Sequence, residues 1–250
     1  MNRLGSAALL DAWDKGHTLS ANAWALWFAA ACRPALAPGH EASDEPQQWP
    51  VGKRDRELLR VRVAAFGPTL EAVAACPACG AQAGFEVPGE ALFAQACADE
   101  ASVPRERVID GFRLAWRPVT AGDLLAIEGA HDAGEAAKAL LERCVRARRD
   151  DGSMVEVHSL PASVRAALGE CLEAADPQAS LRVALSCPAC GHQWTMAFDI
   201  VSFLWHELSA WALRLLGEVH ALAQAYGWSE ADILALSAAR RRRYLGMLTS

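Results

Sequence analysis

The hydrophobic pattern predicts helices at both ends of the chain. Apolar side chains recur at helical spacing in residues 4–16 and 20–33, and the second stretch is expected to end before Pro34. Near the C-terminus, the apolar run 201–226 is expected to form a long helix. A further helix is expected to start at Ser229, which has the spacing of a capping residue.

The pattern changes around two pairs of cysteines. Residues 54–66 favour a helix that ends at Gly67-Pro68, although their few apolar positions also suit a strand. Short strand-like runs then flank the motif CPACG at 76–80, and similar runs flank a second CPACG at 187–191. Each motif is therefore predicted to lie within a β-hairpin.

The segment between the two hairpins is predicted to be largely helical. Thr120 and Asp123 have the spacing of a capping box and are expected to start a helix. Residues 134–149 continue as an amphipathic helix that includes their arginine-rich end, and residues 160–176 form another. Residues 112–116 interrupt this helical pattern with a strand-like run.

The two CPACG units are similar beyond the motif itself. Aligned on their cysteines, the units match at these segments: 69–70 with 180–181 and, with a two-residue difference in length, 85–87 with 198–200. Each unit reads as strand, turn, strand and helix. An internal duplication is the most economical interpretation.

The compartment in which the protein is expected limits the chemistry of its cysteines. Charged residues interrupt the apolar stretch near the N-terminus before it could form a signal peptide, and we expect a cytoplasmic protein. In a reducing compartment, paired CxxC spacings favour metal or redox chemistry over disulfides. The other four of the eight cysteines lie in apparently helical sequence and are interpreted as small core residues: Cys32, Cys97, Cys144 and Cys171.

A CPxCG turn can hold half of a tetrahedral metal site. Its proline restricts the turn, and its glycine permits the positive φ that lets backbone N–H groups point at the thiolates. Two such turns supply four ligands and predict a closed, structural zinc-ribbon site for Zn²⁺ made by Cys76, Cys79, Cys187 and Cys190. The alternatives are a thioredoxin-like redox centre, paired disulfides, or two separate sites completed by His192 or a partner chain.

These elements predict an α+β fold that is mainly α-helical, with a zinc ribbon split into two β-hairpins. The predicted organisation is an N-terminal helical region 1–60, a split zinc ribbon 61–90 and 176–200, an inserted helical region 91–175 and C-terminal helices 201–250. The long insertion makes the metal a clamp between hairpins that are distant in sequence.

The sequence offers no catalytic constellation, and we expect a protein that is not an enzyme. No phosphate-binding glycine loop or Ser-His-Asp order stands out, and His206-Glu207 lacks the second histidine of HExxH because residue 210 is alanine. His206 and His220 are interpreted as core or surface residues. A hydrolase site near them is the weakest of three functional hypotheses.

Two features near the C-terminus could serve a partner. The run Arg240–Arg243 could contact phosphate or acidic groups, although four successive arginines on a helix point in all directions and some must cover packing surface. The formal net charge of −6 gives no global footprint for nucleic acid. A zinc-ribbon nucleic-acid-binding regulatory protein is the alternative function. Trp205, Trp211 and Leu215–Leu216 form an apolar face that suits a core or a partner interface.

Several motifs carry a family resemblance. Residues 51–87 contain "RD" and "LLxxR" ahead of "FG" and a CPxCG turn, and residues 112–125 contain "R-P-x-T-x-x-D". Both stretches resemble baseplate proteins of contractile-tailed phages that are related to a hub-assembly component. Residues 198–248, with "GWxExDILxLxxxRRxxYL", are similar to homologous proteins encoded with extracellular contractile injection systems, the phage-tail-like machines of bacteria.

The resemblance implies a structural or assembly function in a baseplate. The expected partners are other baseplate or hub proteins of a contractile injection particle, with no membrane contact. The protein is then expected in the cytoplasm or as part of an assembled particle.

Overall fold

The structure, a computed structural model, describes residues 5–36, 45–93 and 105–248. Its helices are α1 Ser6–Gly16, α2 Ala21–Leu36, α3 Val51–Phe66, α4 Gly89–Phe93, α5 Ala121–Ala126, α6 Ala133–Cys144, α7 Ala162–Ala175, α8 Ile200–Tyr226, α9 Glu230–Ala235 and α10 Ala238–Leu248, with short 3₁₀ turns η1 Pro46–Gln48, η2 Val157–Ser159 and η3 Pro177–Ser180. Its strands are β1 Thr69–Ala75, β2 Gln82–Pro88, β3 Arg105–Ile109, β4 Phe112–Trp116, β5 Val145–Arg149, β6 Met154–Val155, β7 Arg182–Ser186 and β8 Gln193–Ala197.

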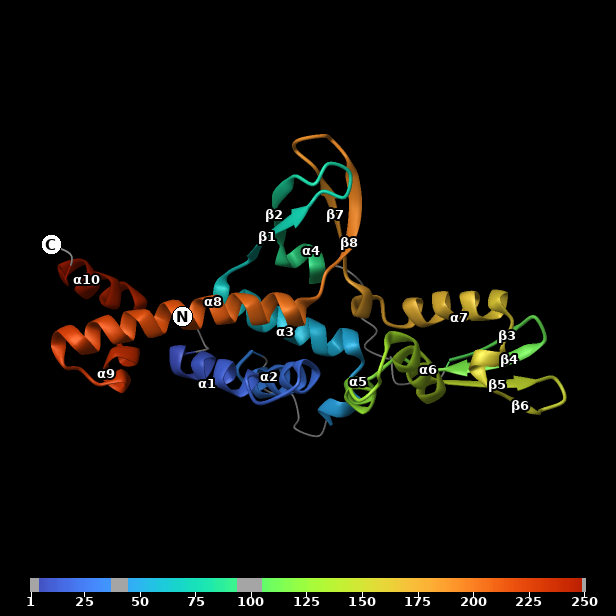
Figure 1. The fold of residues 1–250 in the computed structure, drawn as a ribbon. Coiled ribbons are helices and arrows are strands. Elements are labelled where there is room, and N and C mark those ends of the chain that lie inside the picture. Colours follow the sequence, from blue (N-terminus) through green and yellow to red (C-terminus); the bar gives the residue numbers. More distant parts are fainter. Residues whose placement is uncertain (1–4, 37–44, 94–104, 249–250) are drawn as a thin grey trace.

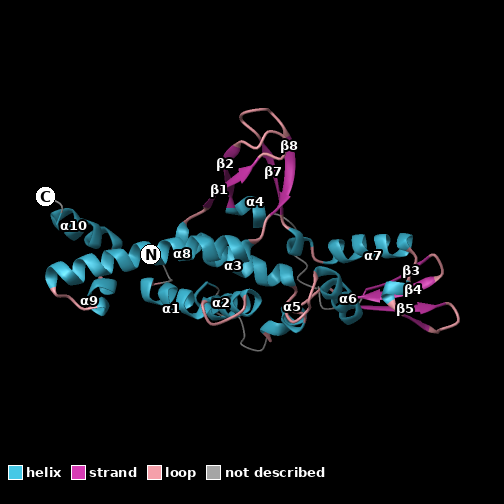
Figure 2. Cartoon of the chain, viewed as in Figure 1, coloured by secondary structure: helices cyan, strands magenta, loops and turns pink. Residues whose placement is uncertain are grey.

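The chain has a helical centre with three extensions. In Figure 1 the two cysteine-bearing hairpins project from the centre, the inserted segment lies at one end and the C-terminal helices lie at the other. Strands are found in the hairpins and in the insertion, whereas the centre and the C-terminal end are helical (Figure 2). The fold is thus mixed α/β and mainly helical, with small antiparallel sheets.

Helices α1, α2, α3 and the first half of α8 build the central core. Trp24, Leu58 and Leu204 are fully buried in it, which explains the strongly apolar character of these helices. The expected helix over 54–66 is confirmed and begins earlier, at Val51. The expected end of α2 before Pro34 is wrong, because the helix continues for three more residues, to Leu36. A proline removes one hydrogen bond of the last turn without ending the helix there.

The two cysteine-bearing hairpins are structural repeats. β1 pairs with β2 from Thr69↔Pro88 to Ala75↔Gln82, and β7 pairs with β8 from Arg182↔Ala197 to Ser186↔Gln193. Both strands of the second hairpin therefore follow those of the first at the same interval of 111 positions. The expected two-residue offset of Phe85 onto Phe198 is wrong, because Phe85 corresponds to Met196 in this register. We call β1, β2, β7 and β8 together the arm.

The insertion is less helical than predicted, although the expected strand at 112–116 is confirmed as β4. It contains an antiparallel sheet of four strands in the order β3-β4-β5-β6, covered by α6 and α7 around a separate core. Helix α6 ends at Cys144, and the arginine-rich stretch after it is strand β5. Val145 and Ala147 alternate with exposed arginines and are buried against the sheet's core, which gives this stretch the period of a strand.

The C-terminal half of α8 forms a third small core with α9 and α10, and we call these elements the C-terminal module. Leu222 and Ile233 are fully buried there, and Gly227 ends α8 in the left-handed conformation with φ 69°. As expected, Ser229 caps the next helix by accepting a hydrogen bond from the Asp232 N–H. Among the described residues, no helix is both long enough and apolar enough to cross a membrane.

A buried carboxylate holds the insertion together. Thr120 and Asp123 form the predicted capping box of α5, and Asp123 also accepts hydrogen bonds from Arg117 and Arg143. Its side chain is 2% exposed. Burial alone would raise the pKa of this carboxyl, but the hydrogen bonds from Arg117, Thr120 and Arg143 hold the pKa well below its usual range.

We expect Asp123→Asn to lower the free energy of unfolding by about 3 kcal/mol at pH 7, because it leaves two arginines without their shared carboxylate. A depressed pKa contributes stability above the unfolded pKa, and this contribution is lost as pH falls below about 4. The difference between wild type and variant, measured by urea unfolding from pH 7 to pH 3, should therefore shrink toward low pH. A constant difference would contradict this account of Asp123.

Candidate metal centre

The two CPACG motifs have the same backbone geometry at the tip of the arm. In the first, the Cys76 N–H donates to Ala81 O and the Gly80 N–H donates to Cys76 O, each at 2.9 Å. In the second, Cys187 and Gly191 make the equivalent bonds at 2.9 Å. Both glycines have φ 73°, a conformation that favours glycine. Each hairpin therefore ends in a tight turn that points two cysteines the same way.

The four cysteine sulfurs of the two turns lie together. The Sγ atoms of Cys76 and Cys190 are 3.7 Å apart, and so are those of Cys79 and Cys187. All four Sγ atoms lie within 4.8 Å of one another. Zn–S bonds of about 2.3 Å place the sulfurs of a tetrahedral site about 3.8 Å apart, which fits this cluster. A disulfide would need about 2.05 Å, and all four cysteines are free.

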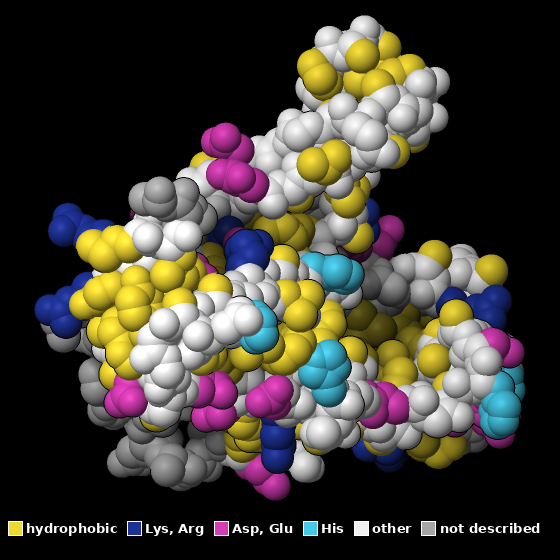
Figure 3. Space-filling view, turned by 60° about the vertical axis from the view of Figure 1, so that its left-hand side comes forward, with side chains coloured by type: hydrophobic (Ala, Val, Ile, Leu, Met, Phe, Trp, Pro, Cys, Tyr) yellow, Lys and Arg dark blue, Asp and Glu magenta, His cyan; other side chains and the backbone are white. Residues whose placement is uncertain are grey.

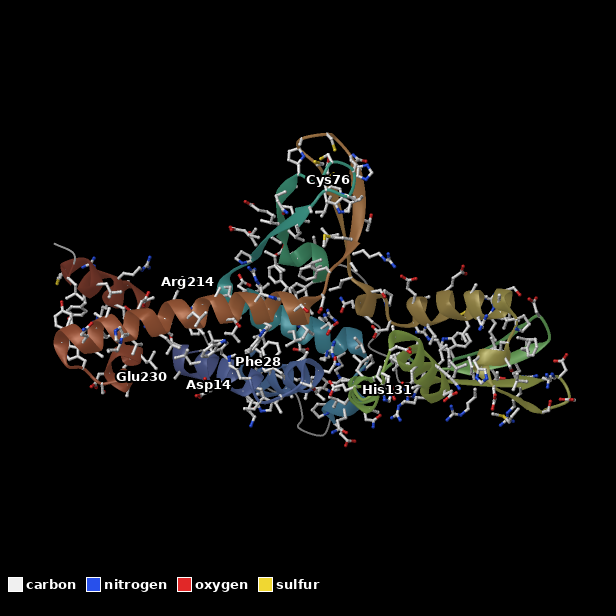
Figure 4. The ribbon with its side chains drawn as sticks, viewed as in Figure 1. Asp14, Phe28, Cys76, His131, Arg214 and Glu230 are labelled. Carbon is white, nitrogen blue, oxygen red and sulfur yellow. The ribbon has the colours of Figure 1, made fainter. Side chains whose placement is uncertain are left out.

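The sulfurs carry different exposures and proton affinities. Cys76, labelled at the tip of the arm in Figure 4, and Cys187 are buried, whereas Cys79 and Cys190 are exposed. Backbone N–H groups of Cys190 and Ala189 lower the pKa of the Cys187 thiol to about 7. The His192 N–H lowers the pKa of Cys190, but hydrogen bonding with Cys79 and Cys187 outweighs it and raises the pKa. Four adjacent thiolates therefore need a cation to be ionised together.

The arrangement separates the alternatives for these cysteines. Each motif joins two strands and does not open a helix, unlike a thioredoxin-like redox centre. The cluster contains the cysteines of both CPACG motifs, so the described residues form one site of four sulfurs rather than two separate sites of two. His192 is outside this set, and its ring stacks on Trp194 with centroids 6.1 Å apart.

The other predicted residues lie apart from this cluster. Cys32 and Cys144 are buried and Cys171 is half-buried, whereas Cys97 lies outside the described residues. Burial raises the pKa of the Cys32 thiol to about 12, which makes it unreactive. His206 and His220 are exposed on α8, and the ring of His206 lies 2.6 Å from the Ser202 carbonyl oxygen.

The arginine run has one buried member. Arg241 is 4% exposed, donates to Glu218 at 2.8 Å and to the Leu236 carbonyl at 2.8 Å, and so fastens α10 to α8. Arg240, Arg242 and Arg243 are exposed. The expectation that part of the run covers packing surface is confirmed for Arg241. Trp205 and Trp211 are partly buried against the central core, as the core interpretation of their face expects.

Sequence reasoning gave no role to Arg62, which joins the arm to the centre. Its guanidinium donates to both carboxylate oxygens of Glu207 at 2.8 Å. It also donates to the carbonyl oxygens of Gly67 and Thr69, at the root of β1. Arg62 is the arginine of the "LLxxR" motif, so the motif was visible in the sequence, but its partner Glu207 lies 145 positions away.

The other quoted motifs are also structural joints. Arg54 and Asp55, the "RD" pair, form an ion pair of 2.7 Å, and Arg54 also donates to Asn22 of α2. Arg117, Thr120 and Asp123, from "R-P-x-T-x-x-D", form the carboxylate network of the insertion. These motifs thus make contacts that join elements of the fold.

The sequence was compared with models of known protein families. A family model described as T4 bacteriophage base plate protein matches residues 40–205. The chain belongs to this family. The matched residues of this base plate protein include both hairpins, the insertion and the three motifs that form joints, whereas Asn22 and Glu207, the partners of Arg54 and Arg62, lie outside the match. A search of the curated proteins and a search of the solved structures found no match.

Membership of the family confirms the resemblance to phage baseplate proteins. It supports a structural component of a phage particle that assembles with other baseplate proteins. The match ends within the first turns of α8, and the C-terminal module lies beyond it. The similarity of residues 198–248 to proteins of extracellular contractile injection systems therefore stays a prediction.

Proposed function

We propose that this base plate protein is a zinc-stabilised structural or assembly component in the baseplate of a phage-tail-like contractile injection system, with no catalytic activity of its own. The observation that carries the proposal is the four-cysteine cluster at the junction of two hairpins within a chain of the base plate family. In this role, the surfaces that the cluster holds in place bind other baseplate or hub proteins.

The donor set supports zinc as the resident metal. Four thiolates in a tetrahedral arrangement favour Zn²⁺ over ions that prefer oxygen ligands, and a site with four protein ligands has no open position for a reactive water. Cys79 and Cys187 are separated by 107 residues, so the ion would close a very long loop. Cys76, Cys79, Cys187 and Cys190 would hold the ion, and their chemistry points to stabilisation.

The proposed function predicts with which particles the protein purifies and what deletion of its gene does to their assembly. In a strain that produces the injection particle, an epitope-tagged chain should purify with sheathed particles or with their baseplate intermediates. Deletion of its gene should leave tubes and sheaths without complete baseplates in electron micrographs. The Cys76→Ser/Cys187→Ser variant should fail to restore assembly, whereas Cys171→Ser, outside the cluster, should restore it. Normal particles in the deletion strain would refute the proposal.

A further inference from the structure

The first hairpin of the arm has an exposed face that the described residues leave uncovered. Glu71 and Glu86 are direct cross-strand neighbours on this face, as are Val73 and Gly84. Like charges at such positions destabilise a sheet, and the side chain of Val73 is 68% exposed. A shallow groove runs along these residues. Figure 3 shows acidic side chains standing together on the stem of the projecting arm.

No contact among the described residues requires the glycine in this face. Gly84 lies mid-strand without a positive φ, and a Cβ at this position would meet nothing within 4 Å. Glycine inside a strand costs about 0.5–1 kcal/mol relative to alanine. A glycine at such a position often marks a bulge, a bend or a place where a ligand or another backbone approaches closely, and the regular pairing of β1 with β2 excludes a bulge. The open space over Gly84, beside Val73, could accommodate an apolar side chain of a partner.

The second hairpin shows that the metal site does not require this face. At the positions of Glu71 and Glu86 it carries Arg182 and Ala197, and at those of Val73 and Gly84 it carries Ala184 and Thr195, while both turns keep the same geometry. The acidic and apolar pattern is therefore specific to the first hairpin.

Helix α10 of the same chain presents the complementary chemistry. Because Arg241 is fixed inward by Glu218, the rotation of the helix is defined, and Arg240, Arg243 and Met247 share one exposed stripe at spacing i, i+3, i+7. Met247 is 66% exposed. In Figure 3, basic side chains stand beside an apolar patch at the left edge of the molecule, on the C-terminal side.

The spacings of the two surfaces match. Residues Arg243 and Met247 are about 6 Å apart along a helix axis at 1.5 Å per residue. Glu71 and Val73 are about 6.7 Å apart along a strand. α10 lies at the far end of α8, a helix of 27 residues, so the two surfaces of one molecule are held apart (Figure 1).

We propose that two copies of this chain associate through these surfaces. α10 of one copy lies along the outer face of β1 and β2 of the other, with Arg240 and Arg243 beside Glu71 and Glu86, and Met247 over Val73 and Gly84. The contact adds a specific partner to the proposed function: a second copy of the chain. It forms either a reciprocal dimer or a head-to-tail assembly.

Charge reversal on each surface tests the contact with the full-length, metal-loaded chain. By sedimentation velocity, wild type should show a mass above that of the 26.8 kDa monomer that rises with protein concentration and falls with salt. E71K/E86K and R240E/R243E should each weaken self-association at least tenfold, a loss of about 1.4 kcal/mol or more. Their equimolar mixture, and the variant with all four changes, should associate again.

Matched controls separate this contact from general charge effects. R242E on another side of α10 and E170K on the exposed face of α7 should associate as wild type does. Metal content and melting temperature should be unchanged in every variant, so failure of the contact leaves the proposed function standing. A wild-type monomer at all concentrations, or no recovery in the mixture, overturns the proposal. If the wild type is a monomer, the acidic face of the first hairpin would instead bind a basic segment of another baseplate protein.

Discussion

Serine at Cys76 and Cys187 is expected to remove the metal and unfold the arm. The change deletes one ligand from each turn, and the two remaining thiolates belong to different hairpins. Metal binding contributes about 10–16 kcal/mol to folding in small zinc peptides, so a large part of the arm's stability should depend on the ion. Circular dichroism melting should show a lower melting temperature, and limited proteolysis should cut within residues 69–88 and 182–197.

A matched cysteine variant gives the control for this experiment. Cys171→Ser changes a half-buried cysteine of α7 that lies outside the cluster and should keep wild-type melting and protease resistance. A chelator added to wild type should reproduce the effect of the double variant. If the double variant melts like wild type, the cluster does not hold the hairpins together.

Replacement of Arg62 by alanine is expected to cost about 3–5 kcal/mol, the usual loss when one partner of a buried ion pair is removed. Arg62 is 2% exposed, and its loss would leave Glu207 and the carbonyl oxygens of Gly67 and Thr69 without their donor. Arg62→Lys should lose less, because it keeps the charge but not the paired geometry of the guanidinium. Urea unfolding measures the three free energies directly.

An exposed ion pair provides the comparison for Arg62. Arg113 pairs with Glu106 at 3.0 Å, but both side chains are more than half exposed, so Arg113→Ala should change stability by less than about 1 kcal/mol. Equal losses for Arg62→Ala and Arg113→Ala would show that the joint between arm and centre adds no stability.

The four-cysteine cluster could be predicted because its chemistry is local. In each pair a proline follows the first cysteine and a glycine follows the second, and the short strands on both sides define a hairpin. That Cys79 and Cys187 meet across the 107 residues between them follows from coordination number, since one turn supplies only half of a tetrahedral site. The structure places the sulfurs as this reasoning expects.

The sheet of the insertion could not be predicted from its residues alone. Only Val145 and Ala147 of β5 point into the core, and two apolar positions fit the period of a helix or of a strand. Because β5 directly follows the helical pattern of α6, the sequence favoured a continuation of that helix. What decides the strand is pairing with β4, from Phe112↔Arg149 to Trp116↔Val145, which is a non-local contact.

Two ion pairs that join helices, Arg62–Glu207 and Arg241–Glu218, could not be predicted for a related reason. Arg62 and Glu207 read as surface charges in their own helices, and only the packing of α3 against α8 buries them together. Arg241 is similar, since its partner Glu218 lies on another helix. An arginine among apolar residues indicates burial of its stem, but no local pattern names the carboxylate that receives it.

The most direct test of the account is the metal content of the purified chain. Protein produced without added metal, analysed by native mass spectrometry and elemental analysis, should contain one zinc ion per chain. The four cluster thiols should become reactive only after the ion is removed. Cys79→Ser/Cys190→Ser should carry no zinc, whereas Cys171→Ser should keep one. A folded wild-type chain with no bound metal and four freely reactive cluster thiols would contradict the account.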